Sequence, residues 1–358
     1  MSRTGHTVDF GYRLAALRLG PLSARFPLRV MLVSVLLLAL ALGAAVVSLR
    51  FGEYPLTVEE VRAALAGEGD EFHRLIVLEW RLPISVAAVA FGVVLGLGGA
   101  IFQSLTRNPL GSPDVIGFDT GTYTAVVVAI LVIGTTNYWM LAGAAVAGGI
   151  ATALLVYVLA WRRGIQSFRL IIVGIGVSAI LGSANAYLVS RAKLEDAMVV
   201  GFWGAGSIRR VTWDSMVPAL LATGVIVVSA LALAPTLRRF ELGDDSAVTL
   251  GTRVNGSRLG LIVVGISGSA LVTAAAGPIG FIALVAPQMA RRLTRSAEVS
   301  LVAAASMGAA LLAAAHLLSL ILAQYFRPIP VGLITISLGG MYLIWLLIRE
   351  ARRQGGLL

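Results

Sequence analysis

The residues of this chain that could carry out chemistry are few and scattered. Ser190 and Lys193 form an S-x-x-K pattern, but the S-D-N and K-T-G motifs that accompany it in serine hydrolases are absent. Lys193 is the only lysine and no Walker A loop surrounds it, so the chain does not bind ATP in that way. His6, His73 and His316 are far apart and cysteine is absent, which leaves no pattern for a metal site. We therefore expect no catalytic residue, no metal and no cofactor.

The acidic residues do not follow the pattern of an ion-driven carrier. Such carriers place carboxylates within their spans, where the groups can be neutralised and recharged. Here Asp114 and Asp119 lie near a loop, and Asp214 lies at the end of a span. This favours a pathway powered by another protein. An ion-coupled secondary transporter is the alternative, and an integral membrane enzyme is a more remote one.

The polar residues within the apolar runs are mostly neutral. Each can form a hydrogen bond between helices or can line a pathway for a polar substrate. Asn185 lies on the run that is richest in Gly, Ser and Asn, so both readings stay open there. The set comprises Gln103, Ser178, Ser183, Asn185 and His316.

The composition identifies the kind of fold that must position these residues. Of the 358 residues, 58% are hydrophobic and only 13% are charged, whereas soluble domains carry about 25% charged residues. The net charge of +10 comes from arginines that flank apolar runs, which is the positive-inside pattern of membrane proteins and not a nucleic-acid-binding surface. We expect an all-α polytopic protein of the cell (plasma) membrane, in contact with lipid and with no nucleic acid.

The apolar runs predict nine or ten spans. Val30–Leu49 is long enough, at about 30 Å as a helix, to cross a bilayer. Five arginines precede it, so residues 1–29 and the basic C-terminal tail are expected in the cytoplasm. Each half of the chain pairs a glycine-rich span with a proline-interrupted one, which suggests an inverted repeat. The expected spans are Val30–Leu49, Pro83–Leu105, Val115–Ile133, Trp139–Ala160, Leu170–Val189, Trp213–Ala234, Leu259–Ala276, Ile279–Arg295, Leu301–Ala323 and Val331–Ile348.

One polar segment, Arg238–Arg258, separates the two apolar halves. Its charges cannot lie in hydrocarbon, because each costs about 2.5–3.5 kcal/mol at the centre of a span. Its acidic residues suit the first turn of a helix, and Gly243 and Gly251 divide it into short pieces. We expect two small helices with a sharp bend, which could transmit motion to a partner. An ordinary solvated loop is the alternative.

Three long segments combine these features in distinctive motifs. Arg81–Gly121 reads RLPISVAAVAFGVVLGLGGAIFQSLTRNPLGSPDVIGFDTG, Gly277–Arg291 reads GPIGFIALVAPQMAR, and Pro330–Leu347 reads PVGLITISLGGMYLIWLL. In order and spacing they closely resemble the permease subunits of ABC importers for iron-siderophores, haem and vitamin B12. The resemblance covers nearly all of the chain from Val30 on. GSPDVIG and the C-terminal motif resemble most the G-type subunit of ferric-enterobactin permeases.

This resemblance implies a fold, partners and sites. It implies a type II ABC importer permease fold, with residues 1–358 as one transmembrane permease domain of ten helices. The expected partners are a second permease subunit, two cytoplasmic ATPase subunits and an extracytoplasmic binding protein that delivers a ferric siderophore; haem or a cobalamin is the alternative cargo. The implied ATPase-coupling segment is Leu237–Gly256, with Leu242, Gly243, Asp244, Asp245, Leu250 and Gly251. The implied pathway residues are Gly174, Ser178, Ser183 and Asn185 on the fifth span, with Gln103.

The docking face departs from the family pattern. Ile84 replaces the second arginine of the family's RLPR motif, and a further docking arginine of some members falls near Leu320 or Ile321. Arg81 and Arg327 remain as the candidate contacts to the binding protein. Because a homodimer would lack the missing arginines twice, we expect a heterodimer with a different permease.

Overall fold

The computed structural model describes all residues except 1–13, 20–21, 115–116, 162–166 and 356–358. The described chain is a bundle of helices preceded by one antiparallel hairpin of β1 (Leu14–Leu19) and β2 (Leu22–Pro27). The helices are α1 (Leu28–Ser48), α2 (Val58–Leu65), α3 (Glu71–Arg74), the π-helical η1 (Leu75–Arg81), α4 (Leu82–Thr106), α5 (Phe118–Leu131), α6 (Tyr138–Ala160), α7 (Ser167–Arg191), α8 (Leu194–Gly204), the 3₁₀ turn η2 (Ile208–Arg210), α9 (Trp213–Glu241), α10 (Asp244–Thr249), α11 (Val254–Ala276), α12 (Ile282–Thr294), α13 (Leu301–Leu322) and α14 (Val331–Gly355).

Seven of the described helices are long and apolar enough to cross a membrane. They are α1, α4 with its continuous α3–η1 extension, α6, α7, α9, α11 and α13. The shorter helices α5 and α12 and the apolar part of α14 stand at the remaining three expected positions. The expected all-α polytopic fold is therefore confirmed.

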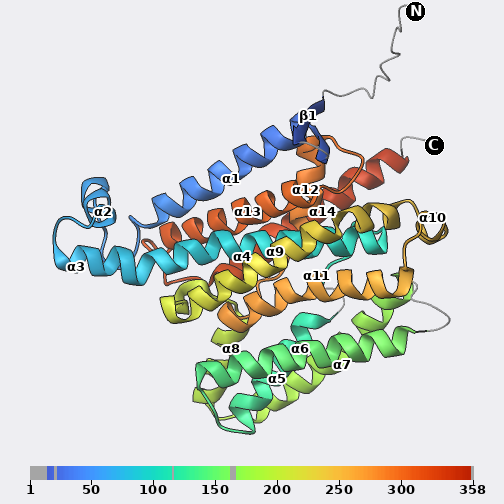
Figure 1. Ribbon diagram of the computed structural model, residues 1–358. Coiled ribbons are helices and arrows are strands. Elements are labelled where there is room, and N and C mark those ends of the chain that lie inside the picture. Colours follow the sequence, from blue (N-terminus) through green and yellow to red (C-terminus); the bar gives the residue numbers. More distant parts are fainter. Residues whose placement is uncertain (1–13, 20–21, 115–116, 162–166, 356–358) are drawn as a thin grey trace, which may run out of the picture.

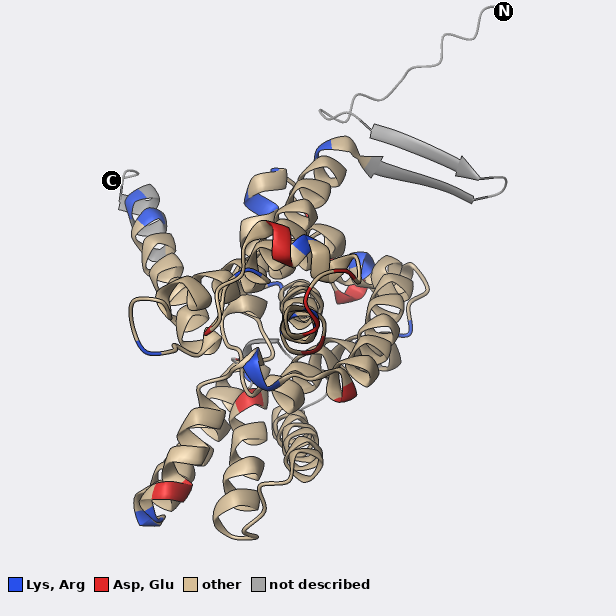
Figure 2. Ribbon diagram, turned by 90° about the vertical axis from the view of Figure 1, so that its left-hand side faces the viewer, with Lys and Arg blue, Asp and Glu red and all other residues tan. Residues whose placement is uncertain are grey.

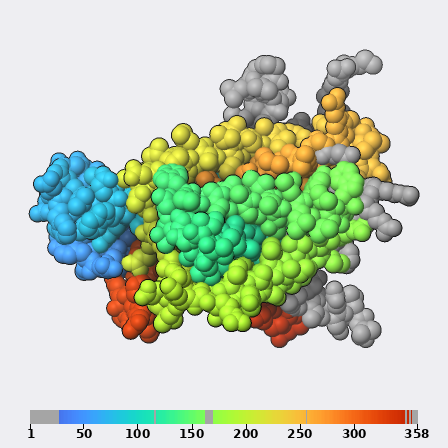
Figure 3. Space-filling model, turned by 90° about the horizontal axis from the view of Figure 1, so that it is seen from below, coloured from blue at the N-terminus to red at the C-terminus, as the bar shows by residue number. Residues whose placement is uncertain are grey.

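The two ends of the bundle differ in what they carry. The short helix α10 and the end of α14 lie at one end, and α2 and α3 lie at the other (Figure 1). The α2–α3 hairpin forms a lobe that stands clear of the other helices, as the blue part of Figure 3 shows. Most residues of the helices are uncharged (Figure 2). We refer below to the α10 end and the α2–α3 end.

Helix α4 lies at the centre of the bundle, in contact with α9, α11, α12 and α13. Its glycines allow these neighbours to approach. Gly92 faces the backbone of Gly308, Gly96 faces Ala304 and Gly99 faces Ala283. At each of these positions a Cβ atom would overlap a backbone carbonyl oxygen. The glycine-rich motif of this span therefore marks close helix packing, as small residues do in membrane interiors.

Helices α5 and α12 are shorter than the other spans. The expected span Ile279–Arg295 is wrong at its N-terminal end, because a helix begins only at Ile282. The described α5 begins at Phe118, and Val115, the expected start of that span, lies outside the described residues. With 14 and 13 residues these helices are about 20 Å long, against about 30 Å for the hydrocarbon core. Both follow proline- and glycine-containing segments and begin after a residue with positive φ. Irregular backbone at membrane depth is tolerated where protein buries it or where it lines a cavity.

Candidate functional site

Asp114, which precedes α5, meets the segment before α12 inside the bundle. Asp114, in the segment before α5, accepts a hydrogen bond from the backbone N–H of Phe281 through Oδ2 at 3.2 Å. Phe281 is the N-cap residue of α12 and has φ of 69°. Asp114, which precedes α5, thus caps the N-terminus of α12. Short, interrupted spans at corresponding positions of two halves are a recurrent place for the substrate site of a transporter.

A second acid, Asp119, lies beside Asp114. Asp119 is in the first turn of α5, and its Oδ1 accepts a hydrogen bond from Ser269 Oγ at 3.0 Å. Asp114 and Asp119 line the same cavity. In the sequence, Asp114 and Asp119 lie near a loop, as expected. In space, however, both acids lie inside the bundle. Sequence reasoning therefore missed a buried acid pair.

Two adjoining cavities open at this acid pair. The smaller, of about 350 Å³, is lined by Asp114, Asp119 and the irregular segment before α12. The larger, of about 640 Å³, lies between α5, α7 and α8. Asp119, Gly204 and Pro278 line both. The two cavities therefore adjoin one another beside the first turn of α5.

Asn185 is the predicted pathway residue that lines the larger cavity. It is only 4% exposed, and its Nδ2 donates to Thr124 Oγ1 at 2.9 Å. The hydroxyl of Thr124 in turn donates to the carbonyl of Thr120. Because the Thr124 hydroxyl proton is used in this way, the Asn185 Nδ2 group must be the donor in the bond between Asn185 and Thr124. Within the described residues, its carbonyl oxygen Oδ1 has no hydrogen-bond partner.

The other predicted pathway residues lie outside these two cavities. Gly174 and Ser178 lie against Gly117, at the start of α5, and Ser178 Oγ donates to the carbonyl of Gly174. Ser183 Oγ donates to the carbonyl of Ala179 within its own helix. Gln103 is buried, and its Nε2 donates to the carbonyl of Leu284 at 2.8 Å. Their role in a pathway remains a prediction.

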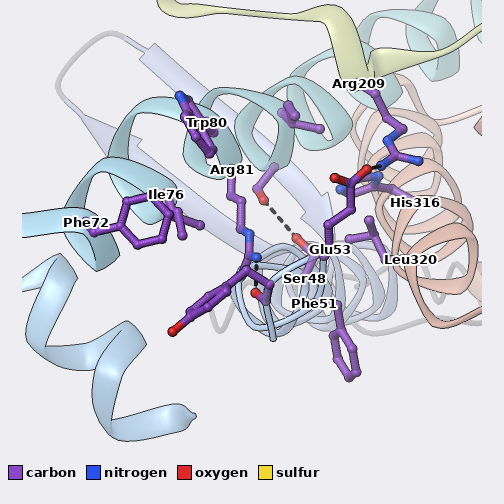
Figure 4. Close-up of a pocket in the computed structure, with 14 residues that line it drawn as sticks. Ser48, Phe51, Glu53, Phe72, Ile76, Trp80, Arg81, Arg209, His316 and Leu320 are labelled. Atoms are coloured by element: carbon purple, nitrogen blue, oxygen red, sulfur yellow. Dashed lines mark hydrogen bonds and ion pairs between the residues drawn. The ribbon is translucent and has the colours of Figure 1, made fainter. Parts of the chain in front are cut away.

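Arg81, one of the two predicted docking residues, lines a pocket of about 330 Å³ at the α2–α3 end (Figure 4). Its guanidinium donates to the carbonyl of Leu49 at 2.7 Å and to the carbonyl of Tyr54. It therefore holds the linker between α1 and α2. Across the pocket, Arg209 pairs with Glu53 at 3.7 Å. Arg327, the other predicted docking residue, is exposed in the segment between α13 and α14.

We expect Arg81→Glu to release the linker of residues 49–57. The variant removes two hydrogen bonds from a charged donor, each worth about 1.5–3 kcal/mol, and it sets a carboxylate against carbonyl oxygens. Hydrogen exchange of the linker amides should rise at least about tenfold. Arg327→Glu is the control, and it should leave this exchange unchanged. If Arg81→Glu exchanged like the wild type while it weakened capture of a binding protein, Arg81 would be a docking contact alone.

At the α10 end, the coupling segment has a defined local structure. One of the two expected small helices is α10, and the second is wrong, because α11 already begins at Val254. Gly243 and Gly251 have φ of 106° and 76°, so each supplies a bend that other residues rarely adopt. Asp244 accepts a hydrogen bond from Arg258 Nη2 at 2.7 Å, and Arg258 also stacks on the ring of Phe240.

These contacts fix α10 against α9 and α11 and leave apolar side chains uncovered. Leu242 is 68% exposed and Leu250 is 52% exposed. Both lie in a polar segment that cannot enter hydrocarbon, and Leu242 directly follows Glu241. Asp245 is also exposed. An apolar contact with a partner protein would account for such exposed leucines.

Comparison with known proteins agrees with this architecture. The chain is 45% identical over 328 residues to the ferric enterobactin transport system permease protein FepG of Escherichia coli, covering 91% of this chain and 98% of the relative. It is 34% identical to the iron(3+)-hydroxamate import system permease protein FhuG of Bacillus subtilis, covering 90% and 97%. A solved inward-facing structure of a putative metal-chelate type ABC transporter matches with a TM-score of 0.75 at 23% identity, covering 88% and 98%. The model of the FecCD transport family matches residues 36–349, so the chain belongs to the FecCD transport family.

Proposed function

We propose that this chain is the non-catalytic permease subunit of an ABC importer that moves a ferric siderophore across the cell membrane. The observation that carries the proposal is the 45% identity, over nearly the whole chain, to a permease of ferric enterobactin transport. Relatives named for iron-hydroxamate and iron-citrate transport support the same class of cargo. ATP would be hydrolysed by a separate partner, and the pathway would switch between outward- and inward-open states.

The two ends of the bundle suit different partners. Arginines lie in the last turn of α9, which leads into α10, and in the last turn of α12, which favours the α10 end on the cytoplasmic side. We expect both termini on that side as well, because arginines flank the first span and form the C-terminal tail. There the segment Leu237–Gly256, with its exposed leucines, would seat in an ATPase subunit. The α2–α3 end would face outward and receive the extracytoplasmic binding protein. Residues 1–358 would act as one permease domain.

The experiment that tests this function is uptake of ferric siderophore in a strain that lacks this chain. Restoring the chain should restore uptake of radioactive iron delivered as a chelate. Uptake should persist when a protonophore collapses the ion gradients and ATP is maintained, which separates the ABC importer from an ion-coupled carrier. Competition by haem or a cobalamin instead of ferric chelates would identify one of those as the cargo.

We expect this chain to pair with a different permease and not with itself. By the family resemblance, Ile84 replaces a docking arginine, and a second docking arginine of some members falls near Leu320 or Ile321. Ile84 and Leu320 both line the pocket beside Arg81. A two-fold homodimer would lack these arginines on both subunits. Co-expression with the ATPase and no other permease should therefore give no transport-competent particle with two copies of this chain. Native mass determination is the measurement, and such a particle would refute the heterodimer.

A further inference from the structure

Two arginines from different helices lie over one aromatic ring at the α10 end. Arg292 is in the last turn of α12, and its guanidinium carbon lies 5.5 Å from the ring centroid of Tyr342 and 4.9 Å from that of Trp345. The guanidinium carbon of Arg349 lies 5.3 Å from the same ring of Trp345. Tyr342, Trp345 and Arg349 are spaced by three and four residues on α14, so they share one face of that helix. We call these four residues the arginine–tryptophan cluster.

The cluster brings positive charges together without a negative charge. Among the described residues, no carboxylate forms an ion pair with Arg292 or Arg349. Glu241 and Glu298 line a cavity at this end that includes neither arginine. A third arginine, Arg29 of α1, lies nearby, because its Nε donates at 3.1 Å to the carbonyl of the residue that follows Arg292. Stacking on aromatic rings orients guanidinium groups but leaves their charge in place, so the cluster attracts an anion.

The cluster lies where a spanning helix reaches the headgroup level. Helix α12 contacts both α1 and α14, and the start of α1 and the end of α14 lie at the α10 end (Figure 1). The apolar part of α14 is Val331–Leu346, so Trp345 is in its last turn. Trp and Tyr are enriched at this level of membrane proteins. Beside Trp345, the apolar side chains of Met341, Ile344 and Ile348 are exposed. The site therefore combines positive charge with an apolar surface that suits acyl chains.

We propose that the arginine–tryptophan cluster binds the phosphate of an anionic phospholipid in the leaflet next to the α10 end. Basic pockets between spanning helices on the cytoplasmic side bind such headgroups. A carboxylate of a soluble partner would balance the charge but would leave the apolar side chains of the span uncovered, so lipid fits better. The inference goes beyond the proposed function and takes from it only the cytoplasmic position of the α10 end.

The test measures lipid binding to the purified full-length chain by native mass spectrometry. The probes are phosphatidylglycerol and phosphatidylcholine with identical acyl chains, and inorganic phosphate is the third probe. We expect the wild type to bind phosphatidylglycerol at least about tenfold more tightly than phosphatidylcholine, because two arginines face its net negative charge. Inorganic phosphate at the same concentration should not displace the lipid, because it has no acyl chains to cover the apolar surface.

Arg292→Gln and Arg349→Gln each remove one positive charge from the cluster. Each should weaken binding of phosphatidylglycerol about fivefold, the equivalent of about 1 kcal/mol for one arginine near an anionic lipid surface, and leave phosphatidylcholine unchanged. Arg349 is exposed, so Arg349→Gln gives a reading where Arg292→Gln fails to fold. Arg253→Gln is the matched control, because Arg253 is exposed at the same end, before α11, and lies outside the cluster.

A second measurement locates the bound lipid. Bromine atoms on acyl chains quench the fluorescence of a tryptophan that they contact. The chain has six tryptophans, so the difference between the wild type and Trp345→Phe isolates the signal of Trp345. Brominated phosphatidylglycerol should quench this signal more strongly than brominated phosphatidylcholine.

The outcomes separate the lipid site from the proposed function. Equal affinity for the two lipids overturns the lipid site, and so does an equal loss of binding in Arg253→Gln, which would show an effect of net charge alone. Displacement of the lipid by inorganic phosphate overturns it in favour of a free anion. Each of these results leaves the siderophore importer intact. A chain that restored no uptake of ferric chelate would overturn the proposed function and leave the lipid measurement standing.

Discussion

Gly99→Ala is expected to destabilise the permease strongly. A Cβ atom at Gly99 would overlap the carbonyl oxygen of Ala283, in the first turn of α12. Backbone cannot move aside as the end of a long side chain can, so α4 and α12 would have to separate. Overpacking of a core costs about 1–3 kcal/mol, and occasionally more. The displaced α12 would also pull Phe281 away from Asp114, so the loss should reach the cavity.

The measurement is the melting temperature of the detergent-purified chain, together with the yield of monodisperse protein. Gly224→Ala is the matched control, because a Cβ atom at Gly224 of α9 would meet no heavy atom within 4 Å. Alanine is the better helix former by about 1 kcal/mol in soluble helices, so this control should melt at the same temperature or higher. Equal melting of the two variants would show that α4 and α12 pack less closely than described.

Much of this fold could be predicted from hydrophobic runs. The sequence patterns of α1, α6, α7 and α13 predict these spans to within a few residues, because each is a long apolar run between polar segments. The glycines of α4 also carried a physical signal. Small residues spaced along one apolar helix predict close neighbours, although not which neighbours.

The interrupted spans were harder to predict, because their apolar runs extend beyond the helices. Proline and glycine in GSPDVIG and GPIGF signal a break in a helix, but they do not show that both breaks lie inside the bundle. The contact between Asp114 and Phe281 joins residues 167 positions apart. No local pattern contains it. The spacing of Asp114 and Asp119 around a helix break was the signal available for a buried acid pair.

The residues that line a pathway on the fifth span were also hard to predict. Four polar or small residues of α7 were predicted to line it, but a helix presents these residues on different faces. Periodicity places Ser178 and Asn185 two turns apart, but the position of the cavity depends on the neighbouring α5 and α8. Only the tertiary structure separates Asn185, in the cavity wall, from Ser183, which bonds to its own helix.

Leu250→Asp is expected to disconnect transport from ATP hydrolysis. Leu250 follows α10 and is 52% exposed on a segment held in place by Arg258 and Asp244. The surroundings of Leu250 within this chain do not account for an apolar side chain at this position. An apolar pocket in the ATPase would account for it. An aspartate there would place an unpaired charge in that contact. Central apolar contacts of an interface are worth about 2 kcal/mol or more, so binding of the ATPase should weaken at least tenfold.

Copurification of the ATPase and iron uptake are the two measurements. Leu250→Met keeps an apolar side chain of similar volume, so it should retain both copurification and iron uptake. This control shows whether the apolar contact or the leucine side chain in particular is required. The melting temperature of Leu250→Asp should match the wild type, because the exposed side chain supports no internal packing of the chain. If Leu250→Asp copurified its ATPase and transported iron normally, the coupling contact would lie elsewhere at the α10 end. The exposed Leu242 on the other side of Gly243 would then be the side chain to test.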